Sequence, residues 1–216
     1  MTDLDAQLSD LAIFPLPGIV LFPHTVLALH IFEPRYRAMV RDLQQQARPL
    51  AMAQIDASAP PVAGQPPPVH TVLGVGTLHN VQELPDGRFL LELLGRARVK
   101  IIHELAPERP YRRVRAERLV DREPGAQVDQ QVEVLRGLLL ALRDSQAASA
   151  QLLQLLSRGA PAQELADVAA HLFISDSEQR QNLLEELSVE KRLSALIDQL
   201  GEQLAPQTPA RTDLLN

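Results

Sequence analysis

The chain has 216 residues, of which 45% are hydrophobic and 22% charged, and its 27 acidic and 21 basic side chains give a formal net charge of −6. This is an ordinary globular composition, so wholesale disorder is excluded. The length allows one large domain or two small ones with a sizeable core.

The N-terminal residues and the cysteine content bear on location. The first ten residues carry three aspartates and no basic residue, unlike the positively charged start of a secretory signal. No apolar run approaches the roughly 18 residues of a membrane span. Because cysteine is absent, disulfides, thiolate nucleophiles and cysteine metal sites are excluded. We expect a cytoplasmic location.

Short apolar runs interrupted by Pro and Gly occupy the first 120 residues, a pattern typical of strands. The predicted strands cover residues 11–14, 26–32, 50–55, 72–81, 88–94, 97–105 and 111–120. A helix is predicted over 34–46, because proline suits the first position of a helix. Its apolar side comprises Tyr36, Met39, Val40 and Leu43. Six or seven short strands with one inserted helix predict a compact barrel or rolled sheet.

Two connections between these strands have distinctive chemistry. Leu84-Pro85-Asp86-Gly87-Arg88 predicts a hairpin, because Pro presets φ for turning and Gly tolerates positive φ. Residues 57–69 hold five prolines and no charge, which predicts a long mobile loop. This loop is either a tolerated insertion, a flap over a binding surface, or a proline-rich ligand for another protein.

Helical spacing replaces the strand pattern after residue 123. Helices are predicted over 126–144, 147–157 and 161–173, followed by one capped by Ser175 and one capped by Ser188. The sequence therefore predicts an α+β protein with a β-barrel subdomain over 8–122, a helical bundle over 123–204 and a frayed tail over 205–216.

Motifs for nucleotide hydrolysis, serine catalysis and metal binding are absent. The sequence contains no GxxxxGK[ST], no GxGxxG after a strand and no GxSxG. None of the six histidines belongs to an HExxH motif. His30 alternates with other strand residues and is predicted to be a core or near-core histidine. We expect no catalytic residue, no metal and no cofactor.

The densest charged feature is a basic strand containing Arg112, Arg113, Arg115 and Arg118. Residues 96–122 carry nine basic and four acidic side chains, whereas residues 123–216 carry seven and fourteen. An intramolecular partner, the acidic helical half, is the simplest interpretation. RNA or an acidic protein partner are the alternatives, although Tyr111 is the one nearby aromatic residue for base stacking and the net negative charge disfavours binding to phosphates.

A resemblance to a known family emerges from several motifs. They are Phe14-Pro15-Leu16, Val20-Leu21-Phe22-Pro23, Leu29-His30-Ile31-Phe32-Glu33-Pro34-Arg35-Tyr36, Val75-Gly76-Thr77, the 84–88 hairpin, Leu94-Gly95-Arg96-Ala97-Arg98, Glu164-Leu165-Ala166-Asp167 and the run from Arg180 to Leu193. Together they resemble the N-terminal substrate-binding domain of Lon protease, a domain also met in cereblon. The resemblance covers about residues 10–200.

This resemblance implies a PUA-like β-barrel with a helical bundle behind it. It also implies a non-enzymatic module that binds unfolded or partly folded protein segments, without ATPase or peptidase parts, and with a protease or chaperone as a further partner. A role as a quality-control adaptor is one expectation. RNA binding along Arg112 to Arg118, a small-molecule site and an unrecognised hydrolase are the alternatives.

The predicted binding surface follows from how such proteins hold unfolded chains. Exposed apolar patches and strand edges bind extended segments by area and main-chain hydrogen bonds. We expect the surface to comprise Phe22, Pro23, His24, Phe32 and Tyr36, flanked by the 57–69 loop. The alternative is that the three aromatic residues simply pack the 34–46 helix against the barrel.

Overall fold

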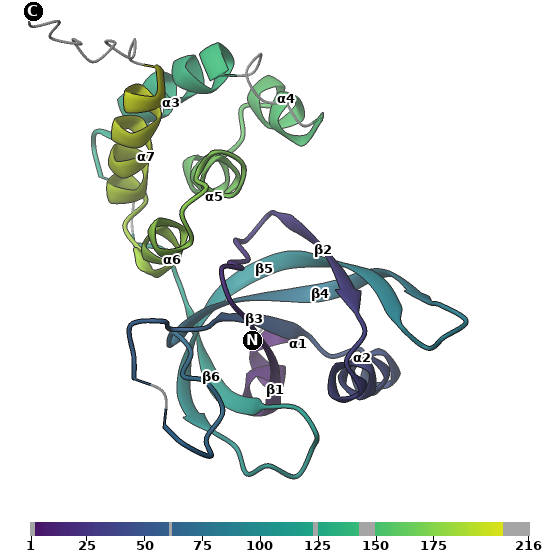
Figure 1. Cartoon of the computed structure of the whole chain (residues 1–216). Helices are drawn as coiled ribbons and strands as arrows, with labels where there is room; N and C mark the ends of the chain where they lie inside the picture. The colour runs from purple at the N-terminus through teal and green to yellow at the C-terminus, as the bar shows by residue number, and fades with distance from the viewer. Residues whose placement is uncertain (1–2, 61, 123–124, 143–149, 205–216) are drawn as a thin grey trace, which may run out of the picture.

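The computed structural model describes residues 3–60, 62–122, 125–142 and 150–204. Strands occupy the first half of the chain and helices most of the second, as predicted (Figure 1). The predicted tail over 205–216 and the predicted helix ends near residues 144 and 147 lie outside the described residues. The subdomain boundary at residue 122 stays a prediction.

Six strands form one sheet that closes on itself. They are β1 (Leu11–Leu16), β2 (Val26–Ile31), β3 (Leu50–Gln54), β4 (Val72–Glu83), β5 (Phe89–Glu104) and β6 (Arg113–Leu119). The strand order is β2-β5-β4-β3-β1-β6, and β6 pairs back onto β5, so that five strands close a barrel and β2 is added to β5. β1 and β3 are parallel, and the other pairs are antiparallel.

β5 corrects the prediction of two separate strands over 88–94 and 97–105. It is continuous through Gly95, and the same edge of β5 pairs first with β2, over Phe89–Leu94, and then with β6, over Arg98–Glu104. A β-carbon at Gly95 would lie 1.9 Å from the carbonyl oxygen of Phe22. Glycine is therefore required here because the β1–β2 connection crosses the sheet in direct contact, and it does not end the strand.

The helix α2 (Pro34–Gln46) has the predicted bounds and buries the predicted apolar side. In the view of Figure 1 it lies below β2, β5 and β4, whereas the helices of the second half lie above them. The hairpin at 84–88 is confirmed, with hydrogen bonds from Gly87 N to Leu84 O and from Leu84 N to Arg88 O, and with Gly87 at φ 78°.

The 57–69 segment is a loop, as predicted, and its base is closed by the bridge between Ile55 and Val69. Arg112 Nη1 donates a hydrogen bond to the carbonyl of Pro67 at 2.8 Å, so part of the loop rests on the barrel. Its mobility stays a prediction.

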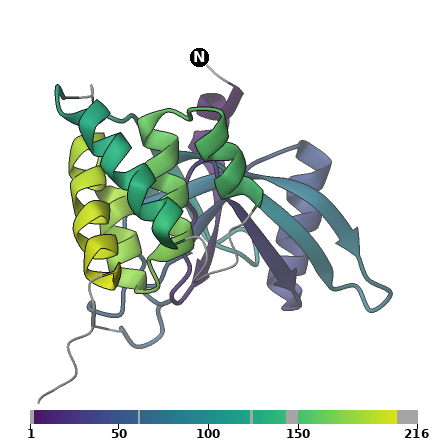
Figure 2. The same cartoon turned by 90° about the horizontal axis from the view of Figure 1, so that it is seen from above.

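Two short elements precede the barrel, α1 (Asp3–Gln7) and a 3-10 turn (Leu8–Asp10). The bundle consists of α3 (Val128–Leu142), α4 (Ala150–Ser157), α5 (Ala162–Phe173), α6 (Ser177–Glu185) and α7 (Val189–Leu204). Figure 2 shows α3 beside α7, and both contact α5. Ser188 caps α7 as predicted, accepting a hydrogen bond from Lys191 N. The cap of α6 is Asp176, which accepts from Gln179 N, so the prediction of Ser175 was wrong by one residue.

The interior is divided between the two halves of the chain. α2 packs on one barrel face, and the helices enclose a separate apolar cluster. Phe22, from the β1–β2 connection, belongs to the helical cluster and is fully buried. The barrel therefore inserts an aromatic ring into the bundle. Within the described residues, no helix has the length and apolar character needed to cross a membrane.

Candidate functional site

An exposed apolar face lies on β2 and the first part of β5. Along β2, Leu29 and Ile31 are buried toward α2, while Val26 and His30 point to the opposite side and are exposed. His30 pairs in register with Leu90 of β5. The exposed fractions are 42% for Val26, 42% for Leu90 and 60% for Phe32. We call Val26, His30, Phe32 and Leu90 the outer face of β2 and β5.

β2 also has an unpaired edge. Among the described strands it pairs only with β5. Gly95 N donates to the carbonyl of Thr25 at 2.8 Å, so Thr25 directs its backbone toward β5. Because backbone groups alternate along an antiparallel strand, Val26, Ala28 and His30 direct their amides and carbonyls away from β5. An exposed edge of this kind is a template for another extended chain.

The structure separates the five predicted binding residues. Phe22, Pro23 and Tyr36 are buried, so a partner cannot contact their rings in this conformation. His24 and Phe32 are exposed. The ring centroid of Phe32 lies 6.0 Å from that of His30, which places both rings on the outer face. Of the predicted surface, Phe32 therefore marks the accessible part.

The buried aromatic residues have structural roles. The ring of Tyr36 lies 4.4 Å from that of Phe14 and packs α2 against the barrel, as the alternative interpretation expected. Phe22 packs into the helical bundle instead. Burial raises the pKa of the Tyr36 hydroxyl above its ordinary value.

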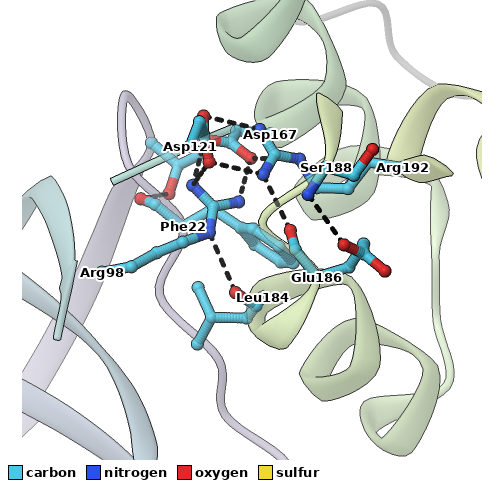
Figure 3. Close-up of polar contacts among 9 residues, drawn as sticks. Phe22, Arg98, Asp121, Asp167, Leu184, Glu186, Ser188 and Arg192 are labelled. Atoms are coloured by element: carbon cyan, nitrogen blue, oxygen red, sulfur yellow. Dashed lines mark hydrogen bonds and ion pairs between the residues drawn. The ribbon is translucent and has the colours of Figure 1, made fainter. Parts of the chain in front are cut away.

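A buried ionic cluster joins the barrel to the bundle (Figure 3). Arg98 of β5 donates to both carboxylate oxygens of Asp167 of α5, at 3.0 and 2.5 Å, and to the carbonyl of Leu184 at 2.9 Å. Arg192 of α7 donates to both oxygens of Asp121, at 2.7 and 2.8 Å. Arg192 Nε also lies 3.7 Å from Asp167 Oδ1, so the two pairs are connected.

The charges of this cluster shift the pKa of Asp121, a residue that follows β6. Burial by itself raises the pKa of the Asp121 carboxyl, but the hydrogen bonds and charge of Arg192 outweigh it and the pKa lies below its usual value of 3.8. The pKa of Arg192 is raised for the matching reason, because Asp121 and Asp167 stabilise its charge against the opposing effect of burial.

A cavity of about 340 Å³ opens beside this cluster, between barrel and bundle. We call it the junction cavity. Its charged lining residues are Arg96, Arg98, Arg118, Arg122, Asp121 and Asp167, and Pro23 and His24 contribute from the β1–β2 connection. It therefore lies along β5 between the segment that pairs with β2 and the segment that pairs with β6.

The basic strand is paired within the barrel. Arg112 donates to both oxygens of Glu104, at 2.7 and 2.9 Å. Arg113 Nη1 donates to Asp10 at 3.0 Å, and Arg48 and Arg113 together lower the pKa of Asp10 against the opposing effect of its burial. Arg112 and Arg113 therefore have intramolecular partners, as expected. These partners, Glu104 and Asp10, belong to the barrel half, so the expectation that the acidic helical half would pair with them was wrong. Arg118 lies 3.9 Å from Asp5 of α1, and Arg115 is exposed.

Metal ligands do not converge in the described part of the chain, where no group of three His, Asp or Glu side chains could hold an ion. His30 is exposed, which corrects the prediction of a core histidine, because the alternate residues Leu29 and Ile31 face α2 instead. His70 lies 3.4 Å from Glu185 and 3.8 Å from Glu178, where it joins the barrel to α6.

Two solved structures share this architecture. The N-terminal domain of Mycobacterium avium complex Lon protease matches 90% of this chain and 100% of its own, with a TM-score of 0.71 and 18% identity. A Lon N-terminal domain protein from Xanthomonas campestris matches 88% of this chain and 97% of its own, with a TM-score of 0.62 and 22% identity. The fold is thus that of Lon N-terminal domains, barrel and bundle together.

A match to a protein-family model identifies the family of this chain. Residues 10–202 match the ATP-dependent protease La (LON) substrate-binding domain, and the chain belongs to that family. The family domain is a non-catalytic module of Lon proteases, and its description names it as the substrate-binding part.

Two Lon proteases are similar to the chain along most of its length. That of Desulforamulus reducens is 25% identical over 93% of this chain, and that of Xanthomonas oryzae pv. oryzae is 27% identical over 91%. The chain spans 25% and 23% of the length of these two enzymes.

Proposed function

We propose that this protein binds unfolded or partly folded protein segments on the outer face of β2 and β5, as a non-enzymatic recognition module. The exposure of Phe32 carries the proposal, because a ring that is 60% exposed beside Val26, His30 and Leu90 offers apolar area that the fold itself leaves uncovered. Apolar area of this kind binds other chains with little demand on their sequence.

The free edge of β2 supports the same role. An extended segment aligned with Val26–Ile31 gains main-chain hydrogen bonds from a strand that pairs on one side only within the described barrel. Every protein segment has the same backbone groups, so binding through them does not depend on the sequence of the segment. Such binding therefore suits unfolded segments of many different proteins, which we call clients. The apolar outer face then adds affinity for hydrophobic side chains.

The wider role belongs to the same proposal. Binding without hydrolysis suits a quality-control adaptor that presents clients to a protease or chaperone, with a cytoplasmic location. The family membership of residues 10–202 supports this assignment.

A fluorescence anisotropy titration tests the proposal. The probe is a labelled, alkylated polypeptide without stable structure, and the variants are Phe32→Ser and, as a control, Val134→Ser, which changes an exposed apolar residue on α3. We expect saturable binding by the parent protein, weakened about tenfold by Phe32→Ser and unchanged by Val134→Ser, because removing an interface aromatic ring costs more than about 1 kcal/mol. The proposal is refuted if the parent protein shows no saturable binding at protein concentrations on the order of tens of micromolar, or if both variants lose affinity equally.

A further inference from the structure

The junction cavity occupies a gap in the pairing of β5. Leu94 pairs with Val26 and Arg98 pairs with Leu119, so Arg96 lies between the strands β2 and β6 on that edge. The β1–β2 connection and the end of β6 border the gap, and Gln163 of α5 and Val189 of α7 face it from the bundle. Barrel and bundle together thus enclose a recess in the barrel wall.

The cavity carries an excess of positive charge. The ionic cluster is balanced, since Arg98 and Arg192 are matched by Asp167 and Asp121. Arg96 and Arg122 add positive charge beyond that balance, whereas Arg118 lies 3.9 Å from Asp5. Within the described residues neither Arg96 nor Arg122 pairs with a carboxylate, and Arg96 Nε donates to the hydroxyl of Thr77 at 3.1 Å.

The recess continues the outer face of β2 and β5. Alternate residues of a strand share a face, so Leu90 and Arg96 lie on one side of β5, whereas the register shift opposite Val75 and Gly76 turns Arg98 to the other side. Arg98 contacts Asp167 of the bundle from that other side, and Leu90 lies beside His30 on the side of Arg96. An extended segment that covers the apolar residues therefore reaches Arg96 as it follows β5 toward the bundle.

We propose that the junction cavity binds a carboxylate of the protein segment held on the outer face, with Arg96 and Arg122 as its principal donors. This inference rests on the proposed function and specifies its substrate class. Guanidinium groups match carboxylates in geometry and bind them by charge-assisted hydrogen bonds. Pro23, Val120 and Val189 supply apolar contacts for the neighbouring side chain.

The lining favours a single carboxylate over a nucleic acid strand. Asp121 and Asp167 lie within the same recess and, by neutralising Arg98 and Arg192, limit the positive charge that an extended polyanion would meet. Stacking platforms for bases are provided by aromatic rings, whereas the described lining contains no Phe, Tyr or Trp.

The test compares three labelled peptides of one apolar sequence: one with a free C-terminal carboxylate, one amidated, and one amidated with an internal Asp. The proteins are the parent, Arg96→Gln, Arg122→Gln and the control Arg115→Gln, which changes an exposed arginine of β6 outside the cavity. We expect the free-carboxylate or the Asp peptide to bind the parent about tenfold more tightly than the amidated one. This preference is lost in Arg96→Gln and Arg122→Gln and kept in Arg115→Gln.

The two carboxylate peptides identify the source, because preference for the free terminus alone indicates C-terminal recognition and preference for the Asp peptide indicates internal acidic residues. Equal binding of all three peptides by the parent overturns the inference and leaves the proposed function standing. Tighter binding of a labelled single-stranded RNA that depends on Arg96 and Arg122 also overturns it. Failure of every peptide to bind overturns the proposed function as well.

Discussion

Arg98 and Asp167 form a doubly hydrogen-bonded ion pair across the barrel–bundle boundary, with side-chain exposures of 4% and 1%. A charge this deeply buried is unfavourable unless an opposite charge satisfies it. The pair therefore favours one arrangement of the two halves, the arrangement in which the junction cavity continues the outer face of β2 and β5.

Removing the acidic partner tests this coupling. Asp167→Asn preserves the side-chain shape but leaves the Arg98 guanidinium without its buried countercharge, so we expect the free energy of unfolding to fall by about 3 kcal/mol or more. Urea denaturation measures the loss. Asp198→Asn, on the exposed side of α7, is the matched control and should change stability by less than about 0.5 kcal/mol. Equal stability of the two variants would show that the ion pair contributes nothing.

The pH dependence of stability should report Asp121. Its pKa in the folded protein lies below the value of 3.8 expected when unfolded, so the unfolded state takes up the proton first as the pH falls. The contribution of Asp121 is therefore present above about pH 4 and is lost as the pH decreases through the folded pKa.

We expect Asp121→Asn to be clearly less stable than the parent at neutral pH and the difference to shrink as the pH falls below about 4 and the parent carboxyl takes up its proton. Urea unfolding at a series of pH values measures the difference. A gap that stays constant across the series would contradict this prediction.

The close approach of Gly95 to the carbonyl of Phe22 predicts how glycine substitutions change stability. A β-carbon at Gly95 would lie 1.9 Å from that oxygen, so Gly95→Ala must displace the β1–β2 connection, at a cost of about 1–3 kcal/mol. Gly201→Ala in α7 is the opposite case, because no neighbouring atom lies within 4 Å. The higher helix propensity of alanine should stabilise that variant by up to about 1 kcal/mol. Thermal unfolding that ranks the two variants in the reverse order would rule out this close approach.

Local patterns predicted the local elements well. The bounds of α2 follow from Pro34 and from an apolar side at helical spacing, and the hairpin follows from Pro85 and Gly87. Both features depend on neighbours in the sequence, where turn chemistry and periodicity act directly.

The faces of β2 could not be assigned in the same way. Val26 and Phe32 are as apolar as Leu29 and Ile31, so alternation shows two faces without saying which one α2 covers. For this reason His30 was predicted to be a core or near-core residue. Val26 and Leu90 were not predicted to be exposed beside Phe32.

The pairing of residues at the junction between barrel and bundle had no local signal, although Arg98, Asp167 and Arg192 each lie in a motif that carries the family resemblance. Arg98, Asp121, Asp167 and Arg192 come from four distant parts of the chain, and only folding brings them together. Phe22 likewise leaves the barrel for the bundle, a destination that its own sequence neighbourhood does not specify.

Amide hydrogen exchange, followed by mass spectrometry with and without a saturating unfolded polypeptide, tests most directly whether clients bind along β2. We expect slower exchange in peptides that contain Val26, Ala28 and His30, and unchanged exchange in peptides from α3. Protection confined to the helices, with β2 exchanging at the same rate in both samples, would contradict this expectation.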